Sequence, residues 1–409
     1  MTPKLNGFDK DSTSSIGKIW SAEWGEYTDR LSGVTIRQLT NYKGHSHHLY
    51  FTNPGWYNNN RKLLFGSDRN NRTNLFSLDL ISGEITQLTD LTPVPPPLET
   101  TFLNTCVNPI LDEAYFWYGS QIMALNLNSL VCRPLWELPT GFVYTMLNCT
   151  ADGKYVCTCI YEDLSDKLQI DLLRGYVGFA ETWAAKPLSK IIRIAVDGSR
   201  SDVVWQEQSW IGHINTSPTA AHLLTFCHEG PWDKVDNRIW GLDHTTGDVW
   251  QIRPRGDDGA NVGHEHWYAD GLHIGYHGRQ PSGEQFFGRI RYDGSECMEI
   301  ETPHTGAYDE NDDHVHLATT QISHYHANDI SLIVGDAGTT VHLWRWNGHN
   351  FDGPRVLCEH HSSMHIQQLH VHPRFSPDSR QILFTSDKSG YGNLYLAPIP
   401  DFDTLPDLA

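Results

Sequence analysis

The chain has 409 residues, and its 49 acidic against 30 basic side chains give a formal net charge of −19 at pH 7. So large a negative charge argues against nucleic acid or an anionic membrane surface as a partner, because phosphate binding depends on clustered Lys and Arg. No stretch approaches the roughly 20 apolar residues of a membrane helix, and the polar N-terminal segment lacks the apolar core of a secretory signal. The eight cysteines are scattered without a C-x-x-C pair, so we expect reduced thiols and a cytoplasmic protein.

One β-rich unit recurs seven times along the chain. Its clearest copy, Asn58–Leu88, contains an apolar β run, an alternating β run, a turn around Ser82–Gly83 and a third β run. Similar copies start near Glu113, Lys154, His222, His273, Ser331 and Gln381. Such units with variable loops are typical of four-stranded blades, so the sequence predicts an all-β, seven-bladed β-propeller. A pair of β-sandwiches is the alternative, but it would not require seven near-equal units.

The two ends of the chain are predicted to meet in the last blade. The seventh copy ends at Pro400 without an outermost strand, while Val34–Leu39 resembles the closing strand Glu84–Leu88 of the first copy. We therefore expect an N-terminal strand to complete the last blade. Residues 33–401 then form one propeller, with a lead segment at 1–32 and a tail at 402–409.

An insertion interrupts the third repeat between Glu162 and Lys190. Its apolar residues from Leu168 to Ala180 recur with a period near 3.6, and Pro187 would end a helix. The pattern predicts a short helical excursion inside the third blade, either as a lid over the channel or as ordinary packing.

Histidine is the unusual residue of this chain, and its clusters lie beside the first strand of the repeats. Among the H-x-H pairs of the chain, three lie at equivalent positions of their blades, at 264 and 266, 324 and 326, and 370 and 372. On an extended segment such a pair lies on one face about 7 Å apart, which suits two ligands of one metal. Neutral imidazoles with the amide oxygen of Gln367 favour a borderline divalent ion such as Mn, Fe, Ni or Zn. The alternative for any single pair is a surface or hydrogen-bonded histidine.

Arg238 follows the acidic and aromatic loop His228–Asp236 in the second β run of its repeat. A channel-lining Arg is a good bidentate receptor for a carboxylate. An ion pair with Asp233, Asp236 or Glu229 is an equal alternative. The chain contains no G-x-S-x-G, Walker A or dinucleotide fingerprint.

Several motifs together resemble the oligogalacturonate lyases, the seven-bladed propeller lyases of pectin breakdown. They are HEGP followed by D-x-R-x-W (Asp236, Arg238, Trp240), the HEHW motif that begins at His264, and Q-x-x-H-x-H with a following F-x-P turn. The resemblance implies a metal site, typically manganese, formed by His324, Gln367, His370 and His372. It implies His264 as the proton-abstracting base and Arg238 as the catalytic arginine. Gln368 and His326 are alternatives for the neighbouring ligands, and His266 stands where an aromatic residue is expected.

The reaction implied by the resemblance is β-elimination on a short 4-linked uronate oligosaccharide, which yields a 4,5-unsaturated uronate. Four further residues are predicted to line the substrate pocket: His213, His228, Trp232 and His266. Trp232 would stack on a sugar ring, although packing in the core is an equal alternative. A lyase for another acidic glycan and a non-catalytic interaction platform remain the competing functions.

Overall fold

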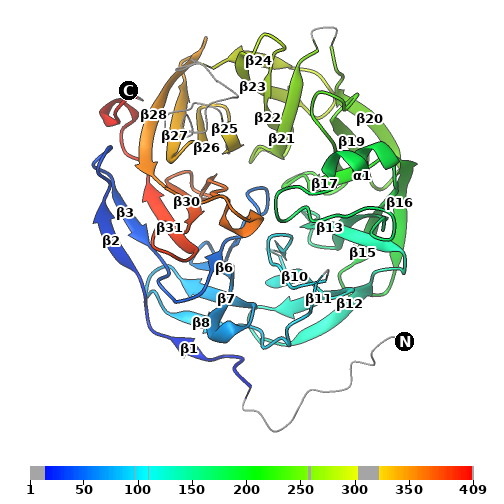
Figure 1. The fold of residues 1–409 in the computed structure, drawn as a ribbon, viewed down its shortest axis with the longest axis horizontal. Coiled ribbons are helices and arrows are strands. Elements are labelled where there is room, and N and C mark those ends of the chain that lie inside the picture. Colours follow the sequence, from blue (N-terminus) through cyan, green and yellow to red (C-terminus); the bar gives the residue numbers. More distant parts are fainter. Residues whose placement is uncertain (1–13, 97, 109, 257–258, 303–321, 408–409) are drawn as a thin grey trace.

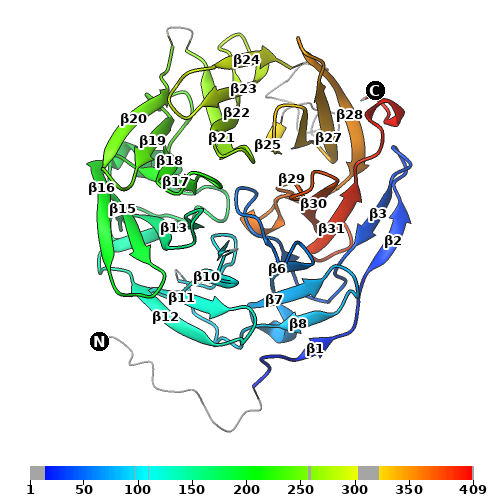
Figure 2. The same ribbon diagram turned by 180° about the vertical axis from the view of Figure 1, so that it is seen from behind.

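Seven antiparallel sheets form a ring in the computed structural model, which describes residues 14–407 except 97, 109, 257–258 and 303–321 (Figures 1 and 2). Blade 1 contains β4 (Ser46–His47), β6 (Lys62–Ser67), β7 (Asn74–Asp79) and β8 (Ile85–Gln87), with β5 (Trp56–Tyr57) also paired to β6 and the turn η1 (Arg69–Asn71) after it. Blade 2 contains β9 (Cys106–Asn108), β10 (Glu113–Tyr118), β11 (Gln121–Asn126) and β12 (Cys132–Glu137). Blade 3 contains β13 (Phe142–Cys149), β14 (Tyr155–Glu162), β15 (Leu188–Ala195) and β16 (Ser201–Gln208).

The remaining blades carry most of the histidines. Blade 4 contains β17 (Ile211–Thr216), β18 (Leu223–His228), β19 (Ile239–Asp243) and β20 (Asp248–Arg253). Blade 5 contains β21 (Asn261–Trp267), β22 (His273–Arg279), β23 (Gln285–Arg291) and β24 (Met298–Glu301). Blade 6 contains β25 (Ile322–His326), β26 (Leu332–Ala337), β27 (Thr340–Trp346) and β28 (Phe351–Glu359). The first strands β17, β21, β25 and β29 contact one another in sequence, so they line the axis of the ring.

Blade 7 joins the two ends of the chain, as predicted. Its C-terminal strands are β29 (Arg374–Phe375), β30 (Gln381–Ser386) and β31 (Asn393–Pro398). The N-terminal strand β3 (Thr35–Gln38) pairs with β31 as the fourth strand, with Arg37 opposite Leu396. Two further N-terminal strands extend the sheets: β2 (Gly25–Thr28) lies outside β3, and β1 (Ile19–Trp20) pairs with β8 of blade 1. Part of the segment before residue 33 is therefore hydrogen-bonded into two blades.

Apolar side chains from neighbouring blades fill the wedges between the sheets. In one cluster Ile36 of β3 and Phe384 of β30 meet Leu343 of blade 6, and in another Leu64 of blade 1 meets Phe116 of blade 2. Large rings suit these wedges because each buries roughly 150–250 Å² of surface. The turn η4 (Phe402–Thr404) adds Phe402 to the first cluster.

The insertion of blade 3 contains one helix, α1 (Phe179–Ala185), which lies on the face seen in Figure 1. It is shorter than the periodicity predicted, because the segment before Phe179 is not helical. Gly175, Tyr176 and Gly178 have φ of +71°, +53° and +79°, values that interrupt a right-handed helix. The helix ends at Lys186, with φ +48°, before Pro187.

The cysteines and the helices bear on the expectations of reduced thiols and of no membrane helix. All eight cysteines are free thiols, five of them buried. None of the helices in the described residues has both the length and the apolar character needed to cross a membrane.

Candidate active site

Three successive blades present a histidine from a β-bulge in their innermost strand. The pairing register shifts between Ile211 and Ile214 in β17, between Gly263 and His266 in β21, and between Ile322 and Tyr325 in β25. The bulged residues are Gly212–His213, His264–Glu265 and Ser323–His324. Because a bulge re-aims side chains, these histidines do not follow the simple alternation of a strand.

Close packing requires glycine before His213 and His264. A Cβ atom on Gly212 would lie 2.4 Å from Oε2 of Glu229, and one on Gly263 would lie 2.2 Å from Cζ2 of Trp232. His264 has a φ of +53°, a sparsely populated conformation for a residue other than glycine. The sequence signal for this arrangement is a small residue followed by His in the first strand of three adjacent repeats.

His324, His370 and His372 form a buried cluster in which the three candidate ligand atoms lie within 4.8 Å of one another. His324 comes from blade 6. His370 and His372 follow the turn η3 (Gln367–Leu369) before blade 7. His324 Nδ1 donates to Asp336 Oδ2 at 3.1 Å, which leaves its Nε2 as an acceptor, 3.5 Å from Nδ1 of His370. His326, the alternative to His324, lies outside this cluster.

This cluster fits a divalent metal ion. Nε2 of His372 is buried and has no hydrogen-bond partner among the described residues, a costly state that a ligand would relieve. Burial lowers the pKa of His370 to about 4 and that of His372 well below its usual range, so both rings are neutral, as metal ligation requires. The ionised Asp336 carboxylate orients His324 in the manner of outer-shell partners of metal-binding histidines.

The two glutamines before the cluster are placed differently from each other. Nε2 of Gln367 donates to the Tyr176 hydroxyl of the insertion at 2.7 Å. Oε1 of Gln368 is buried without a hydrogen-bond partner in the described part of the chain. The motif assigns the ligand to Gln367, so the choice between the two amides stays a prediction.

His264 lies between the metal-site candidates and a second buried histidine. Its ring centroid is 5.0 Å from that of His324, and its Nδ1 is 2.7 Å from Nε2 of His277 on β22. Burial, followed by the neighbouring His324, lowers the pKa of His264 well below its usual range. The sequence analysis did not select His277. The signal that could have selected His277 is a polar residue within β22, a strand in which the adjacent residues are buried.

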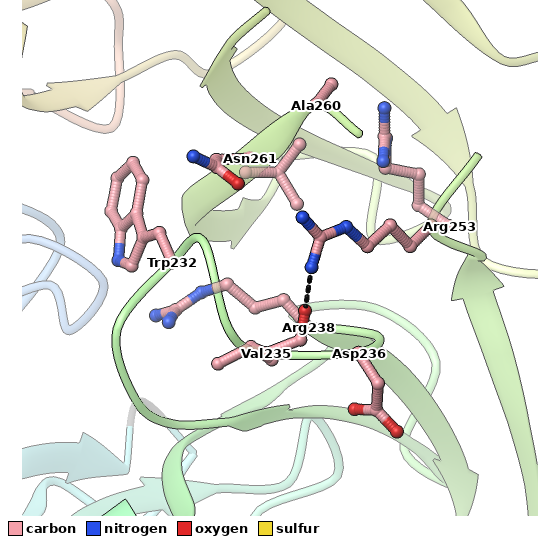
Figure 3. A pocket seen from close by; sticks show the side chains of 9 residues that line it. Trp232, Val235, Asp236, Arg238, Arg253, Ala260 and Asn261 are labelled. Carbon is pink, nitrogen blue, oxygen red and sulfur yellow. Dashed lines mark hydrogen bonds between the residues drawn. The ribbon is translucent and has the colours of Figure 1, made fainter. Parts of the chain in front are cut away.

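Arg238 immediately precedes β19 and is held between two carboxylates. Its Nε donates to Glu265 Oε2 at 2.9 Å and its Nη1 to Glu229 Oε1 at 3.1 Å. These bonds leave Nη2 without a partner among the described residues, and the guanidinium extends toward Trp232 (Figure 3). Glu229 was one of the predicted ion-pair partners, whereas Glu265, on the same bulged strand as His264, was not anticipated.

A small cavity lies between Arg238 and His264. It is lined by Tyr50, Phe51, Thr52, His213, Arg238, His264 and Glu265. The Tyr50–Phe51 segment lies in its wall: Tyr50 stacks on His213, and the Phe51 carbonyl accepts from Nη1 of the buried Arg374 at 2.7 Å. Arg238 also lines a second small pocket, together with Trp232, Arg253 and Arg255 (Figure 3).

The predicted substrate-pocket residues separate into two groups. His213 lines the cavity, and Trp232 contacts Arg238 and the ring of His264. His228 instead bonds Glu207 at 2.9 Å and Asp236 at 3.3 Å, and these bonds raise its pKa against the opposing effect of burial. Both ring nitrogens of His266 are engaged: Nε2 accepts from the backbone of Ala327 and Nδ1 donates to the carbonyl of His264. Neither His228 nor His266 lines either pocket.

The fold and site define a class: a seven-bladed propeller with a buried histidine cluster beside a fixed arginine. Residues 15–289 match the oligogalacturonate lyase family. The chain is 27% identical to an oligogalacturonide lyase of Pectobacterium atrosepticum, over 92% of this chain and 96% of the relative. It is also 27% identical to an oligogalacturonate lyase of Dickeya dadantii, over 94% of this chain and 98% of that protein. The solved structure of an oligogalacturonate lyase in complex with manganese superposes with a TM-score of 0.81 at 24% identity, covering 94% of this chain and 98% of the other.

This chain therefore belongs to the oligogalacturonate lyase family and is a polysaccharide lyase.

Proposed function

We propose that this protein cleaves short oligogalacturonides by metal-dependent β-elimination. The observation that carries the proposal is the convergence of a neutral His264, a fixed Arg238 and the His324–His370–His372 cluster on one buried centre. The two curated relatives are an oligogalacturonide lyase and an oligogalacturonate lyase, which supports this substrate class.

His324, His370 and His372 would hold the ion, with the amide of Gln367 as the fourth protein ligand. When bound, a divalent ion such as manganese supplies Lewis-acid neutralisation of the uronate carboxylate. His48 supports this ligand set, because its Nε2 donates to the carbonyl of His372 at 2.9 Å.

Arg238 would bind the uronate through its Nη2 and contribute a second positive charge where negative charge develops on the substrate. Two carboxylates hold the guanidinium in one orientation, so little reorganisation is required when the substrate binds. Glu229 and Glu265 also compensate its charge. The bare site therefore has no surplus positive charge from Arg238, and a cation in the histidine cluster would provide the net attraction for an anionic sugar.

His264 would remove the C5 proton, which lies α to the carboxylate. Its burial keeps the imidazole neutral, as a base must be, and positioned base catalysis contributes about 10²–10⁴-fold. The C5–H electron pair forms the C4–C5 double bond, and the C4–O bond breaks. The departing oxygen takes a proton from water or from another group of the protein.

Absorbance in the ultraviolet band of an unsaturated uronate tests this proposal directly. Digalacturonate and trigalacturonate are incubated with the protein, with added manganese or with EDTA. A metal-dependent rise in absorbance supports the elimination. Unchanged turnover after complete chelation would remove the metal from the mechanism. No rise with metal shown to be bound would direct the search to other uronates or to a binding role.

A further inference from the structure

His277 has no role in the reaction proposed above, yet it makes the closest polar contact of His264. The two rings are parallel to within 6°, with centroids 5.0 Å apart and Nδ1 of His264 2.7 Å from Nε2 of His277. The contact is built into blade 5: His277 on β22 pairs with Gly263, the last paired residue before the bulge of β21 that begins at His264. The residue His277 is only 5% exposed to solvent, so water competes little for this hydrogen bond.

Two neutral imidazoles at this distance share a single hydrogen, and it can belong to either ring. If His264 carries it on Nδ1, the lone pair of His264 is on Nε2. If His277 carries it, Nε2 of His264 is protonated and cannot act as a base. Nε2 of His264 has no hydrogen-bond partner among the described residues, and His264 lines the cavity that also contains Arg238. The first arrangement therefore directs a free lone pair to the place where the proposed substrate would bind.

We propose that His277 is a positioning residue that accepts the Nδ1 hydrogen of His264 and so fixes the tautomer of the base. This inference rests on the proposed function of His264. When the C5–H bond breaks, the new N–H bond forms on Nε2, and the Nδ1–H of the imidazolium stays in a charge-assisted bond to His277, which is stronger than the neutral one. Loss of the Nε2 proton to solvent or to the leaving oxygen restores the starting tautomer.

His277 could instead serve only to pack Trp232, whose ring lies 5.5 Å from the centroids of both His264 and His277. Two substitutions separate these roles. His277→Leu removes the acceptor and keeps apolar volume beside Trp232, whereas His277→Gln retains an acceptor oxygen. His273→Gln is the matched control, because His273 lies on the same strand but bonds Asp270 and Glu296 at the surface.

We expect His277→Leu to lower kcat by about 100-fold, the lower end of what a positioned base contributes, with KM and manganese affinity within about twofold of wild type. The kcat of His277→Gln should be at least about tenfold higher than that of His277→Leu. The kcat of His273→Gln should equal that of wild type. Equal losses in the Leu and Gln variants, or a loss that appears in metal affinity, would overturn the proposal.

A second readout does not require activity. In metal-free protein labelled with ¹⁵N-histidine, the His264 signals are assigned by their absence in His264→Gln. We expect Nδ1 of His264 to be the protonated nitrogen in wild type and in His277→Gln, and a mixture of tautomers in His277→Leu. Protonation of Nε2 in wild type would refute the role of His277. If the wild-type protein cleaves no uronate, the proposed function fails. The tautomer measurement still decides separately whether His264 donates to His277 or accepts from it.

Discussion

The two histidines of HEHW in blade 5 face different environments although one residue separates them. His264 has a free Nε2 at the cavity, whereas His266 uses both ring nitrogens on backbone groups, one of which is the carbonyl of His264 itself. The pair in blade 6 divides in the same way: His324 joins the metal-site candidates, and His326 accepts from the backbone of Phe375. In each pair the first histidine is available for chemistry and the second holds the local backbone.

The bulges explain this division. On a regular strand, residues i and i+2 share one face, so an H-x-H pair there could supply two ligands to one metal. The pairs on β21 and β25 depart from that regular geometry, because the register shifts at His264 and His324 turn these side chains away from their partners. Only His370 and His372, which lie outside any regular strand, both enter the cluster.

The largest expected effect is on the free energy of unfolding at acid pH. It involves histidines available for chemistry as well as histidines that hold the backbone. Burial lowers the pKa of seven histidines to about 3 or 4: His47, His48, His266, His277, His342, His360 and His370. Below their ordinary pKa of about 6.5 the unfolded chain binds more protons than the folded one, so stability falls as pH falls. We expect cooperative unfolding between about pH 6.5 and pH 4, measured by circular dichroism in metal-free protein. A free energy of unfolding that stays constant from pH 7 to pH 5 would contradict the assignment of neutral buried rings.

Removing His264, the available histidine of the blade 5 pair, should lower turnover strongly without loss of metal. His264→Gln is expected to lower kcat by about 10²–10⁴-fold, the contribution of a positioned base. Manganese content, measured by equilibrium dialysis, should be unchanged. A variant with near wild-type kcat would assign the base elsewhere, with His213, which lines the same cavity, as the residue to test next.

The metal-site candidates can be weakened without removing a ligand. Asp336→Asn replaces the carboxylate that holds His324 Nδ1–H, and such a change typically lowers metal affinity by about 10–100-fold. Calorimetric titration with manganese measures the effect, and Asp329→Asn, an exposed residue near the same strand, is the control. Unaltered affinity in Asp336→Asn would show that the orientation of His324 does not limit binding.

The smallest effect is expected for the second member of a pair. His326→Leu removes the acceptor of the Phe375 amide, and an unsatisfied buried donor costs about 1–3 kcal/mol. Urea denaturation should record this loss in the free energy of unfolding, while manganese affinity remains that of wild type. Weaker manganese binding with undiminished stability would instead make His326 part of the metal site, and the contrast within the pairs would fail.

Sequence periodicity was sufficient for the ring of blades and for its closure, because alternation and turn residues are local signals repeated seven times. The helix of the insertion was predicted too long, because glycines with positive φ interrupt an otherwise regular apolar pattern. For the site, His324, His370 and His372 came from motifs that carry their spacing along the chain. His277 and Glu265 were missed because each acquires its importance from a partner on another strand.

The sequence by itself determined the number of blades, the meeting of the chain ends in blade 7 and the residue types that gather at the centre. Only the tertiary structure decided which histidines have a free nitrogen, which carboxylates hold Arg238 and which ring bonds His264. The physical reason is that a histidine's role depends on the hydrogen bonds of both ring nitrogens. Those bonds are formed by groups that the fold brings together from distant parts of the chain.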